Sequence, residues 1–257
     1  MIRKRYLLSA FCFSILLNFK HIYLYCSPAF FMYLLVHYVL RDQAGKAKEN
    51  SVMKFMKLAI ITIIPFVVSF GPFFVVDGFE GIKQIFSRLF PFGRGLVHEF
   101  WAPNFWALYM FFDKIVYFAM TRIFKSSQLQ LIPKEEIGVN PNTHLKVLPN
   151  IPPVLTIAII LAFLLPFFYR VFKESSQSSK NQPGEKVTEY RQFCHNNFAL
   201  MVCISGLIFF LFGFHVHEKA ITPYINLLLL FCPQTKFVAL AIFVNLVNLL
   251  PLLITPK

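Results

Sequence analysis

The sequence contains few charged residues and very few acids. Charged residues make up 14% of the chain, and only 12 of its 257 residues are Asp or Glu. Soluble domains carry about 25% charged residues, and disordered chains and coiled coils depend on charge and polarity to stay solvated. The composition therefore argues against a disordered chain, a coiled coil and an ordinary soluble domain.

Cysteine is also scarce, and its spacing shows no motif. The cysteines lie in or beside apolar runs, without the paired spacing of a disulfide framework or a zinc site. We interpret them as small core residues. They are Cys12, Cys26, Cys194, Cys203 and Cys232. The sequence predicts neither a metal site nor a cofactor.

Apolar residues are abundant instead. They make up 57% of the chain, which includes 33 Phe, against about 45–50% in soluble domains. The runs free of Asp, Glu, Lys and Arg are 22–40, 58–76, 151–169, 196–214 and 237–254, and two shorter runs are 6–19 and 220–235. Since a membrane-spanning helix needs about 20 mostly apolar residues, these runs predict an all-α polytopic integral membrane protein with about 6–8 hydrophobic helices.

The basic residues indicate how the chain is oriented. The formal net charge is +13, but the bases lie between apolar runs and form no basic helix, which disfavours a nucleic-acid partner. Segments 41–57 and 170–195 carry five Lys or Arg each, so the positive-inside rule predicts that both are cytosolic loops. Region 77–150 holds eight bases against six acids and is predicted to lie on the opposite side.

This topology requires that 104–120, which contains Asp113 and Lys114, does not cross the membrane as a simple span. We therefore predict that it is a re-entrant or interfacial helix. Residues 1–257 then form a single transmembrane helical domain, and segments 86–106 and 215–219 lie on the same, non-cytosolic face.

The first polar cluster, His-Val-His-Glu-Lys at 215–219, directly follows an apolar run. An ionisable cluster at a membrane boundary is costly unless it is solvated or used. His215 and His217 are able to hydrogen-bond a phosphate or transfer a proton, and Lys219 is able to neutralise a phosphate. Glu218 is placed to orient either. The alternative interpretation is a loop at a helix end, solvated by lipid headgroups.

The second cluster lies in 86–106, where Arg88 and Arg94 flank a Pro-Phe-Gly turn. Both tryptophans of the chain, Trp101 and Trp106, fall in the same segment. Arginine binds phosphate, and Trp either stacks on sugar rings or anchors in the membrane interface. The segment is a candidate ligand site or, alternatively, an aromatic belt whose arginines contact lipid phosphates.

A third polar pair, Lys20 and His21, interrupts the apolar stretch 18–28. The pair is placed to contribute to a ligand site at a tight hairpin on the non-cytosolic side. The alternative is a Lys that snorkels from a helix end.

Three sequence blocks resemble a known family. FKHIYLY (19–25), SRLFPFGRGLVHEFWAPNFWALY (87–109) and FGFHVHEKAI (212–221) are similar to blocks of the endoplasmic-reticulum dolichyl-phosphate-glucose glucosyltransferases, in the family order. The WAPNFWAL and HVHEKA forms are most similar to the members that act as the second α-1,3-glucosyltransferase of lipid-linked oligosaccharide assembly. The blocks span 19–221, so the resemblance covers nearly the whole chain.

The resemblance implies a membrane-embedded C-type glycosyltransferase of the endoplasmic-reticulum membrane, with its active site and region 77–150 on the luminal side. Such an enzyme transfers glucose, with inversion, from dolichyl-phosphate-glucose to the dolichyl-diphosphate oligosaccharide Glc1Man9GlcNAc2 in protein N-glycosylation. The reaction needs a general base for the acceptor hydroxyl and stabilisation of the departing phosphate. Membrane lipids are the other expected partners.

The family's His-Glu-Lys motif falls on His217, Glu218 and Lys219. By analogy His217 contacts the donor phosphate, and the chemistry of their side chains assigns Lys219, Arg88 and Arg94 to the same phosphate. The predicted supporting residues are Glu218, His215, Lys20 and His21, and the predicted sugar or lipid contacts are Trp101 and Trp106.

The chain departs from the family on its N-terminal side. The family's catalytic carboxylate lies in the first luminal loop, and the resemblance aligns this chain with the C-terminal half that follows it. None of the acids outside the two cytosolic loops lies in the family's base motif, so we expect that the 257-residue chain alone transfers no glucose. Two alternatives stay open: a binding or regulatory subunit that keeps the donor-side residues, and a membrane transporter, although the spans lack repeats and mid-membrane polar residues.

Overall fold

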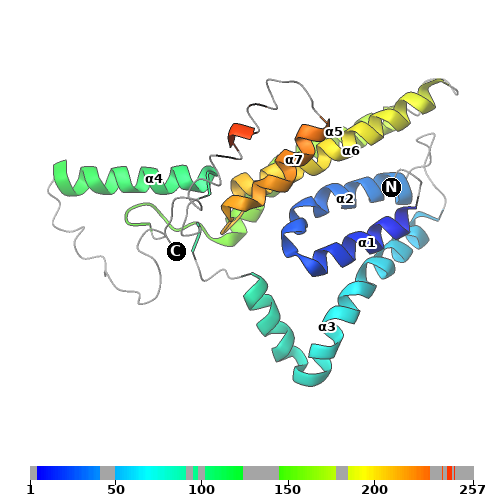
Figure 1. Cartoon of the computed structure of the whole chain (residues 1–257), viewed down its shortest axis with the longest axis horizontal. Helices are drawn as coiled ribbons and strands as arrows, with labels where there is room; N and C mark the ends of the chain where they lie inside the picture. The colour runs from blue at the N-terminus through cyan, green and yellow to red at the C-terminus, as the bar shows by residue number, and fades with distance from the viewer. Residues whose placement is uncertain are drawn as a thin grey trace.

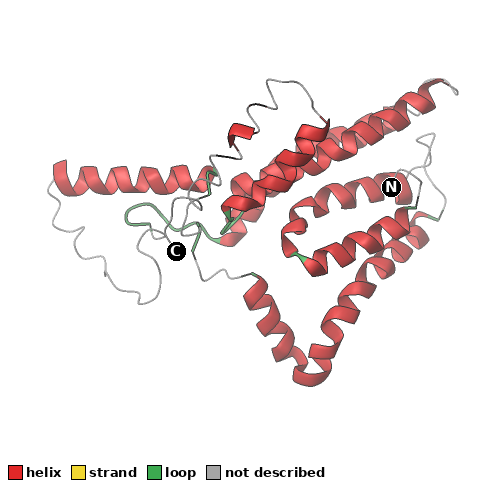
Figure 2. Ribbon diagram, in the orientation of Figure 1, coloured by secondary structure: helices red, strands yellow, loops and turns green. Residues whose placement is uncertain are grey.

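The structure is a computed structural model, and every regular element among its described residues is a helix (Figure 2). The described residues are 5–40, 50–90, 95–97, 102–123, 145–177, 185–231, 239, 242–244 and 246. For these residues the all-α prediction is confirmed. The chain forms an N-terminal helical hairpin, a long bent helix, a side helix and a C-terminal group of helices (Figure 1).

The N-terminal hairpin has two limbs that lie side by side (Figure 1). Its elements are α1 (Tyr6–Phe19), η1 (His21–Cys26), α2 (Ser27–Leu34) and η2 (Leu35–Leu40). The chain turns at Lys20, whose extended backbone (φ −155°, ψ 109°) ends α1. Pro28 fits in the first turn of α2, where no intrahelical N–H bond is needed.

Helix α3 (Ser51–Leu89) is 39 residues long and bends sharply at Gly78. Gly78 has φ 61° and ψ −146°, a non-helical conformation that glycine adopts without the strain of a Cβ. Gly81 lets the chain close up after the bend, because a Cβ there would lie 2.6 Å from the Cβ of Asp77. The result is a V whose first arm packs against α1 (Figure 1).

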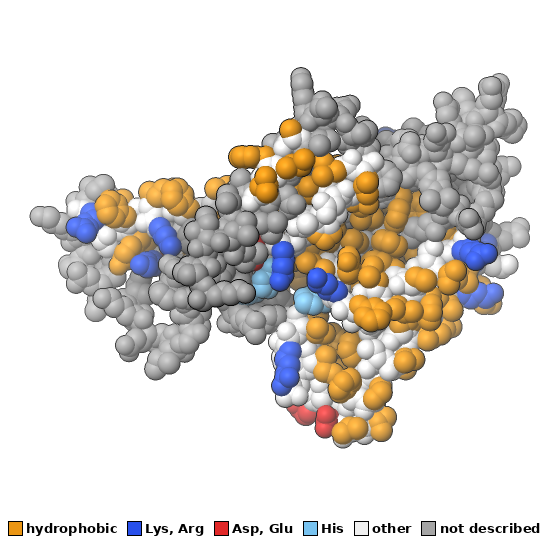
Figure 3. All heavy atoms as spheres, viewed as in Figure 1, with side chains coloured by type: hydrophobic (Ala, Val, Ile, Leu, Met, Phe, Trp, Pro, Cys, Tyr) orange, Lys and Arg blue, Asp and Glu red, His pale blue; other side chains and the backbone are white. Residues whose placement is uncertain are grey.

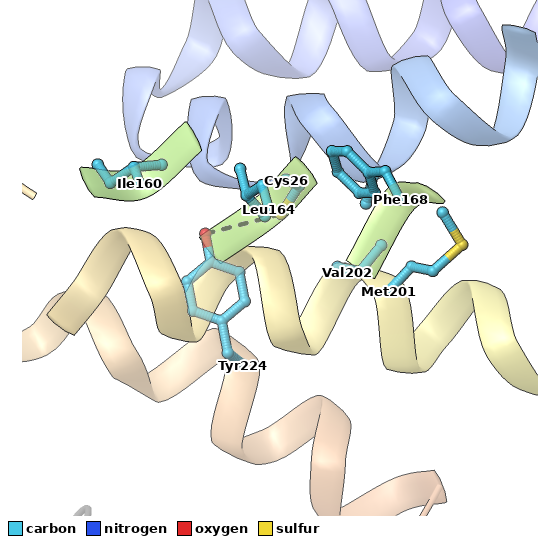
Figure 4. Close-up of a cluster of buried hydrophobic side chains, with 8 residues drawn as sticks. Cys26, Ile160, Leu164, Phe168, Met201, Val202 and Tyr224 are labelled. Carbon is cyan, nitrogen blue, oxygen red and sulfur yellow. Dashed lines mark hydrogen bonds between the residues drawn. The ribbon is translucent and has the colours of Figure 1, made fainter. Parts of the chain in front are cut away.

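The C-terminal group of helices buries the largest core cluster against the hairpin (Figure 4). Its elements are α5 (Pro153–Gln177), α6 (Glu185–Phe212), η6 (Glu218–Ile221) and α7 (Thr222–Phe231). Helix α6 is central, since it contacts α5, α7, α2 and η1. The buried cluster consists of Cys26, Ala29, Ile160, Leu164, Phe168, Met201, Val202 and Tyr224.

Tyr224 ties α7 to both α6 and η1. Its hydroxyl donates to the carbonyl oxygen of Ile22 at 3.3 Å and accepts from the Cys26 thiol, with Sγ and Oη 3.6 Å apart (Figure 4). Its ring packs on Gly206 of α6 so closely that a Cβ at that glycine would overlap the ring atoms. The neighbouring Ser205 hydroxyl donates to the carbonyl oxygen of Tyr25 at 2.6 Å. One close contact therefore joins three elements.

Helix α4 (Phe105–Phe118), continued by η4 (Ala119–Ile123), projects to one side of the other helices (Figure 1). Asn104 caps its N-terminus by accepting the backbone N–H of Ala107 at 3.1 Å. Asp113 is fully buried and accepts three further backbone N–H groups at 2.8 Å each. The donors are Lys146, Val147 and Leu148. These bonds hold the segment that enters α5 against α4.

The helices can be compared with the predicted spans. Two described stretches are long and apolar enough to cross a membrane by length and composition, and these are His21–Leu40 and Ser51–Leu89. They contain the predicted runs 22–40 and 58–76. Three shorter apolar helices, Tyr6–Phe19, Pro153–Tyr169 and Phe198–Phe212, fall on 6–19, 151–169 and 196–214. Helix α7 covers the middle of 220–235, and most of 237–254 lies outside the described residues.

The predicted loops are shorter than the sequence indicated. Loop 41–57 ends early, because α3 already begins at Ser51. Loop 170–195 is shortened from both ends by α5 and α6. Region 77–150 begins with the second arm of α3 and contains α4. In each case polar residues continue a helix beyond the end of its apolar run, where hydropathy gives no signal.

We predict that Gly206→Ala lowers the stability of the chain, because the added methyl group would push α7 off α6. Overpacking of this kind costs about 1–3 kcal/mol. Gly71→Ala in α3 is the matched control, since nothing lies within 4 Å of a Cβ there and Ala favours the helix. Thermal unfolding of the purified chain in detergent measures both variants. Equal transition temperatures would show that the Tyr224 contact is loose.

Candidate functional site

Three polar segments that are far apart in the sequence meet at one end of the helical body. They are 20–22 in the turn of the hairpin, 88–97 at and after the end of α3, and 213–219 between α6 and α7. In the space-filling view, His and Lys or Arg side chains gather near the centre of the face, next to a broad apolar surface (Figure 3). Each segment carries residues that the sequence marked as candidates.

The loop between α6 and α7 separates its ionisable residues by depth. His215 has φ 53°, in the left-handed region, and its ring lies 5.9 Å from that of His217. His217 is extended (φ −83°, ψ 148°) and starts η6. Glu218 is only 2% exposed, whereas Lys219 is exposed. The loop therefore holds the carboxylate inside and presents the ammonium group outside.

His215 fastens this loop to residues 95–97. Its backbone N–H donates to the carbonyl oxygen of Leu96 at 2.8 Å, and its Nδ1 lies 3.0 Å from the carbonyl oxygen of Gly95. Because a carbonyl oxygen only accepts, Nδ1 carries a proton in this contact. Two hydrogen bonds thus join blocks 86–106 and 215–219, which agrees with the expectation that both lie on one face.

Lys20 and His21 belong to the same end of the molecule. The exposed His21 ring meets the ring of Phe90 edge-on, with centroids 6.4 Å apart. The next residue, Ile22, packs with Val216 beneath the loop between α6 and α7. The exposed Lys20 lies directly before His21, at the turn. The third predicted pair is therefore placed between the end of α3 and the 213–219 loop.

The structure describes two of the four candidates predicted in 86–106. Arg88 is exposed in the last turn of α3, while Arg94 and Trp101 lie outside the described residues. Trp106 is 2% exposed and packs with Leu96 and Val97. The predicted contact of Trp106 with sugar or lipid does not match this position, because the core encloses its ring. Its place instead supports the segment that His215 binds.

Sequence reasoning missed two residues that position this site. Tyr224 was counted only as part of an apolar run, although it fixes α7 and hence the loop before it. The available signal was the pair Ser205 and Gly206 inside an apolar helix, since small residues mark close helix packing in membranes. Asp113 was read only as a charge that interrupts a run, and no local signal names its partners.

The site offers groups that suit an anion. Among the described side chains, no group of three or more His, Cys, Asp or Glu could hold a metal ion. The same end of the molecule instead carries cationic or N–H-donating side chains, which bind phosphate well. These are Lys20, His21, Arg88, His217 and Lys219.

We predict that His215→Ala loosens the contact between residues 95–97 and the loop between α6 and α7. The substitution removes the ring donor and strains the left-handed backbone, whereas His215→Asn keeps a side-chain N–H and tolerates φ above zero. Hydrogen–deuterium exchange of peptides covering 95–97 and 213–217 reports the change. Faster exchange in the Ala variant but not in the Asn variant is expected. Unchanged exchange in both would mean that His215 does not hold the two segments together.

Comparison with known proteins gives the relatives of this chain. A model of the ALG6, ALG8 glycosyltransferase family matches residues 1–257. A Dictyostelium discoideum protein named dolichyl pyrophosphate Glc1Man9GlcNAc2 alpha-1,3-glucosyltransferase is 35% identical over 248 residues, which cover 86% of this chain and 36% of the relative. A Candida albicans protein of the same name is 36% identical over 92% of this chain and 39% of the relative.

A Drosophila melanogaster protein, named as a probable enzyme of the same kind, is 37% identical over 86% of this chain and 38% of its own length. The chain thus spans less than two fifths of the length of these three relatives. No solved structure matches it. Because the family model covers the chain from end to end and the HVHEKA and WAPNFWAL blocks meet in one site, the chain belongs to the ALG6, ALG8 glycosyltransferase family.

Proposed function

We propose that this chain forms the donor-binding part of an α-1,3-glucosyltransferase that acts on lipid-linked oligosaccharide in the endoplasmic reticulum. The donor is dolichyl-phosphate-glucose, and the acceptor is the dolichyl-diphosphate oligosaccharide named for its relatives, Glc1Man9GlcNAc2. The observation that carries the proposal is the convergence of segments 20–22, 88–97 and 213–219 at one end of the helices. An isolated helix-end cap would not draw three such segments together.

The chain is proposed to be a multi-pass membrane protein. Large apolar side chains are more than 60% exposed on several helices, a surface that water would penalise and lipid would not. Examples are Val68 and Val75 on α3, Leu108 on α4 and Leu165 on α5. We place the converging segments on the luminal side, because the two lysine- and arginine-rich segments of the sequence favour the cytosol.

Helix α4 fits an interfacial position better than a span. One of its faces is apolar and exposed, with residues at helical spacing. These residues are Phe105, Leu108, Phe111, Phe112, Ile115 and Phe118. The other face carries Asp113, whose carboxylate is saturated by backbone N–H groups of segment 145–150. A helix with one apolar and one anchored polar face lies along a membrane surface.

At the proposed site, cationic and N–H-donating groups stabilise the departing phosphate. His217 is proposed to donate to a phosphate oxygen, and Lys219 and Arg88 to offset its charge as the bond to glucose breaks. Glu218, buried beside His217, is proposed to orient that side chain. Attack by the acceptor hydroxyl on the face opposite the leaving phosphate would invert the anomeric centre.

The general base is proposed to lie outside the acids described here. Asp113 is buried and bound by three N–H groups, and Glu218 is buried beside the phosphate-binding residue. Asp77 and Glu80 lie at the bend of α3, where Glu80 is 3.6 Å from the ammonium group of Lys83. None of these positions suits abstraction of a proton from an acceptor bound at the 213–219 loop.

We predict that His217→Ala, in the full enzyme context, lowers kcat for glucose transfer by about 100-fold or more, the usual effect of removing one donor to a developing negative charge. Transfer of labelled glucose from dolichyl-phosphate-glucose to the oligosaccharide lipid measures it. Asn226→Ala, at an exposed position of α7, is the control and should leave transfer unchanged. Normal transfer by the His217 variant, with normal membrane insertion of both, would return the loop to a headgroup-solvated cap.

We also predict that the purified 257-residue chain binds dolichyl-phosphate-glucose but does not transfer glucose. Equilibrium binding of the labelled donor in detergent and a parallel transfer assay separate the two properties. Binding that is lost in Lys219→Ala, without turnover in either chain, is the expected result. Measured transfer by the unaltered chain would show that it contains its own base, and absence of binding would disprove the donor-binding role.

A further inference from the structure

Helix α3 is too long to be a single membrane span. Its 39 residues would make a straight rod of about 58 Å at about 1.5 Å per residue. The hydrocarbon core of a bilayer is about 30 Å thick. Residues 51–77, before the bend, are sufficient to cross it, so the second arm, 79–89, must lie somewhere other than along the same line.

The bend turns the second arm back toward the first. At Gly78 the backbone leaves the helical region entirely (φ 61°, ψ −146°). The rings of Phe70 in the first arm and Phe86 in the second then lie 6.1 Å apart across the inside of the V. Phe86 also stacks on Phe90, which in turn meets His21 of the candidate site. The inside of the V is therefore aromatic and leads to the site.

The second arm divides into two clean faces. At about 100° per residue, its apolar residues occupy one half of the helix and its polar residues the other. The apolar half holds Phe79, Ile82, Ile85, Phe86 and Leu89, and the polar half holds Glu80, Lys83, Gln84, Ser87 and Arg88. The first arm shows no such division, since residues 58–76 carry no charge at all. The change of pattern coincides with the bend.

The polar half lies on the outside of the V. Its side chains and Asp77 line an open depression of about 560 Å³ that runs along the bend. In the space-filling view, acidic side chains lie at the vertex of the V and a basic side chain on its outer edge, while apolar side chains cover the first arm (Figure 3). The ionic pair of Glu80 and Lys83 is almost fully exposed. This surface is suited to water and headgroups.

From this geometry we propose that residues 79–89 form an amphipathic helix that lies in the luminal headgroup layer of the bilayer. Its apolar half rests on the acyl chains inside the V, and its polar half faces the lumen. The occupant of the apolar half is lipid, because Phe79 is 80% exposed and adjoins Val75 and Val76 of the first arm, which are 83% and 80% exposed. This continuous apolar surface runs without a break from the span into the arm.

The proposed placement sets the depth of the candidate site. Because Phe90 at the end of the arm touches His21, the pair Lys20 and His21 is held at the level of the lipid phosphates. A lipid phosphate donor would then meet these side chains without leaving its own layer. The inference rests on the membrane span proposed above for α3, and its test involves no donor, acceptor or transfer.

The test is depth measurement by spin labels in liposomes made of phosphatidylcholine. Single cysteines at Phe79, Gln84 and Val68 carry a nitroxide, and the signal of the labelled, unsubstituted chain is subtracted. Power saturation compares collisions with oxygen, which enriches in lipid, and with a nickel chelate, which stays in water. All three positions are exposed, so the substitutions leave packing intact.

We expect the oxygen-to-nickel collision ratio to be several-fold higher at Phe79→Cys than at Gln84→Cys, and highest at Val68→Cys in the span. Equally high nickel collisions at Phe79 and Gln84 would place the arm in water and overturn the proposal. Equally high oxygen collisions at both would place it inside the bilayer, and exclusion of both reagents at Phe79 would show that protein covers it. Each outcome is independent of glucose transfer, so the proposal and the proposed function fail separately.

Discussion

The close packing of Tyr224 on Gly206 is the contact on which the site depends most. It brings α7 against α6 at the shortest approach a helix pair allows, and the tyrosine hydroxyl then reaches the carbonyl oxygen of Ile22 in the hairpin. The loop 213–219 connects the two helices that this contact joins. Because Ile22 directly follows His21, the same contact also fixes the third polar segment. A lipid environment favours such packing, since small residues replace the hydrophobic drive that helices lack in a membrane.

A second constraint is that charge must stay at the helix ends. The apolar interior of a bilayer makes an unpaired charge costly, so the candidate groups gather where helices stop and turn. Asp113 is the informative exception. It lies in the middle of α4 and is fully buried, yet its carboxylate oxygens accept three backbone N–H groups. This arrangement supplies the hydrogen bonds that a buried carboxylate needs.

The bend at Gly78 and the clasp at His215 serve the same arrangement from different directions. The bend carries the chain from a long apolar helix to the phenylalanine beside His21. The clasp holds the following segment, at Gly95 and Leu96, against the loop that carries the family's His-Glu-Lys motif. Membership in a glycosyltransferase family gives this convergence a chemical meaning. Cationic side chains from three segments surround the place where a lipid-bound phosphate would lie.

The sequence by itself determined the helical class, the position of most apolar helices and the three polar blocks, because hydropathy and residue type are local properties. It also predicted that blocks 86–106 and 215–219 share a face, from the charge of the loops alone. Only the tertiary structure decided how these blocks touch: that His215 bonds backbone at Gly95 and Leu96, that Trp106 is buried beneath them, and that α3 bends at Gly78. These features depend on partners that are distant in sequence or on a single backbone conformation, and neither leaves a periodic pattern for hydropathy to detect.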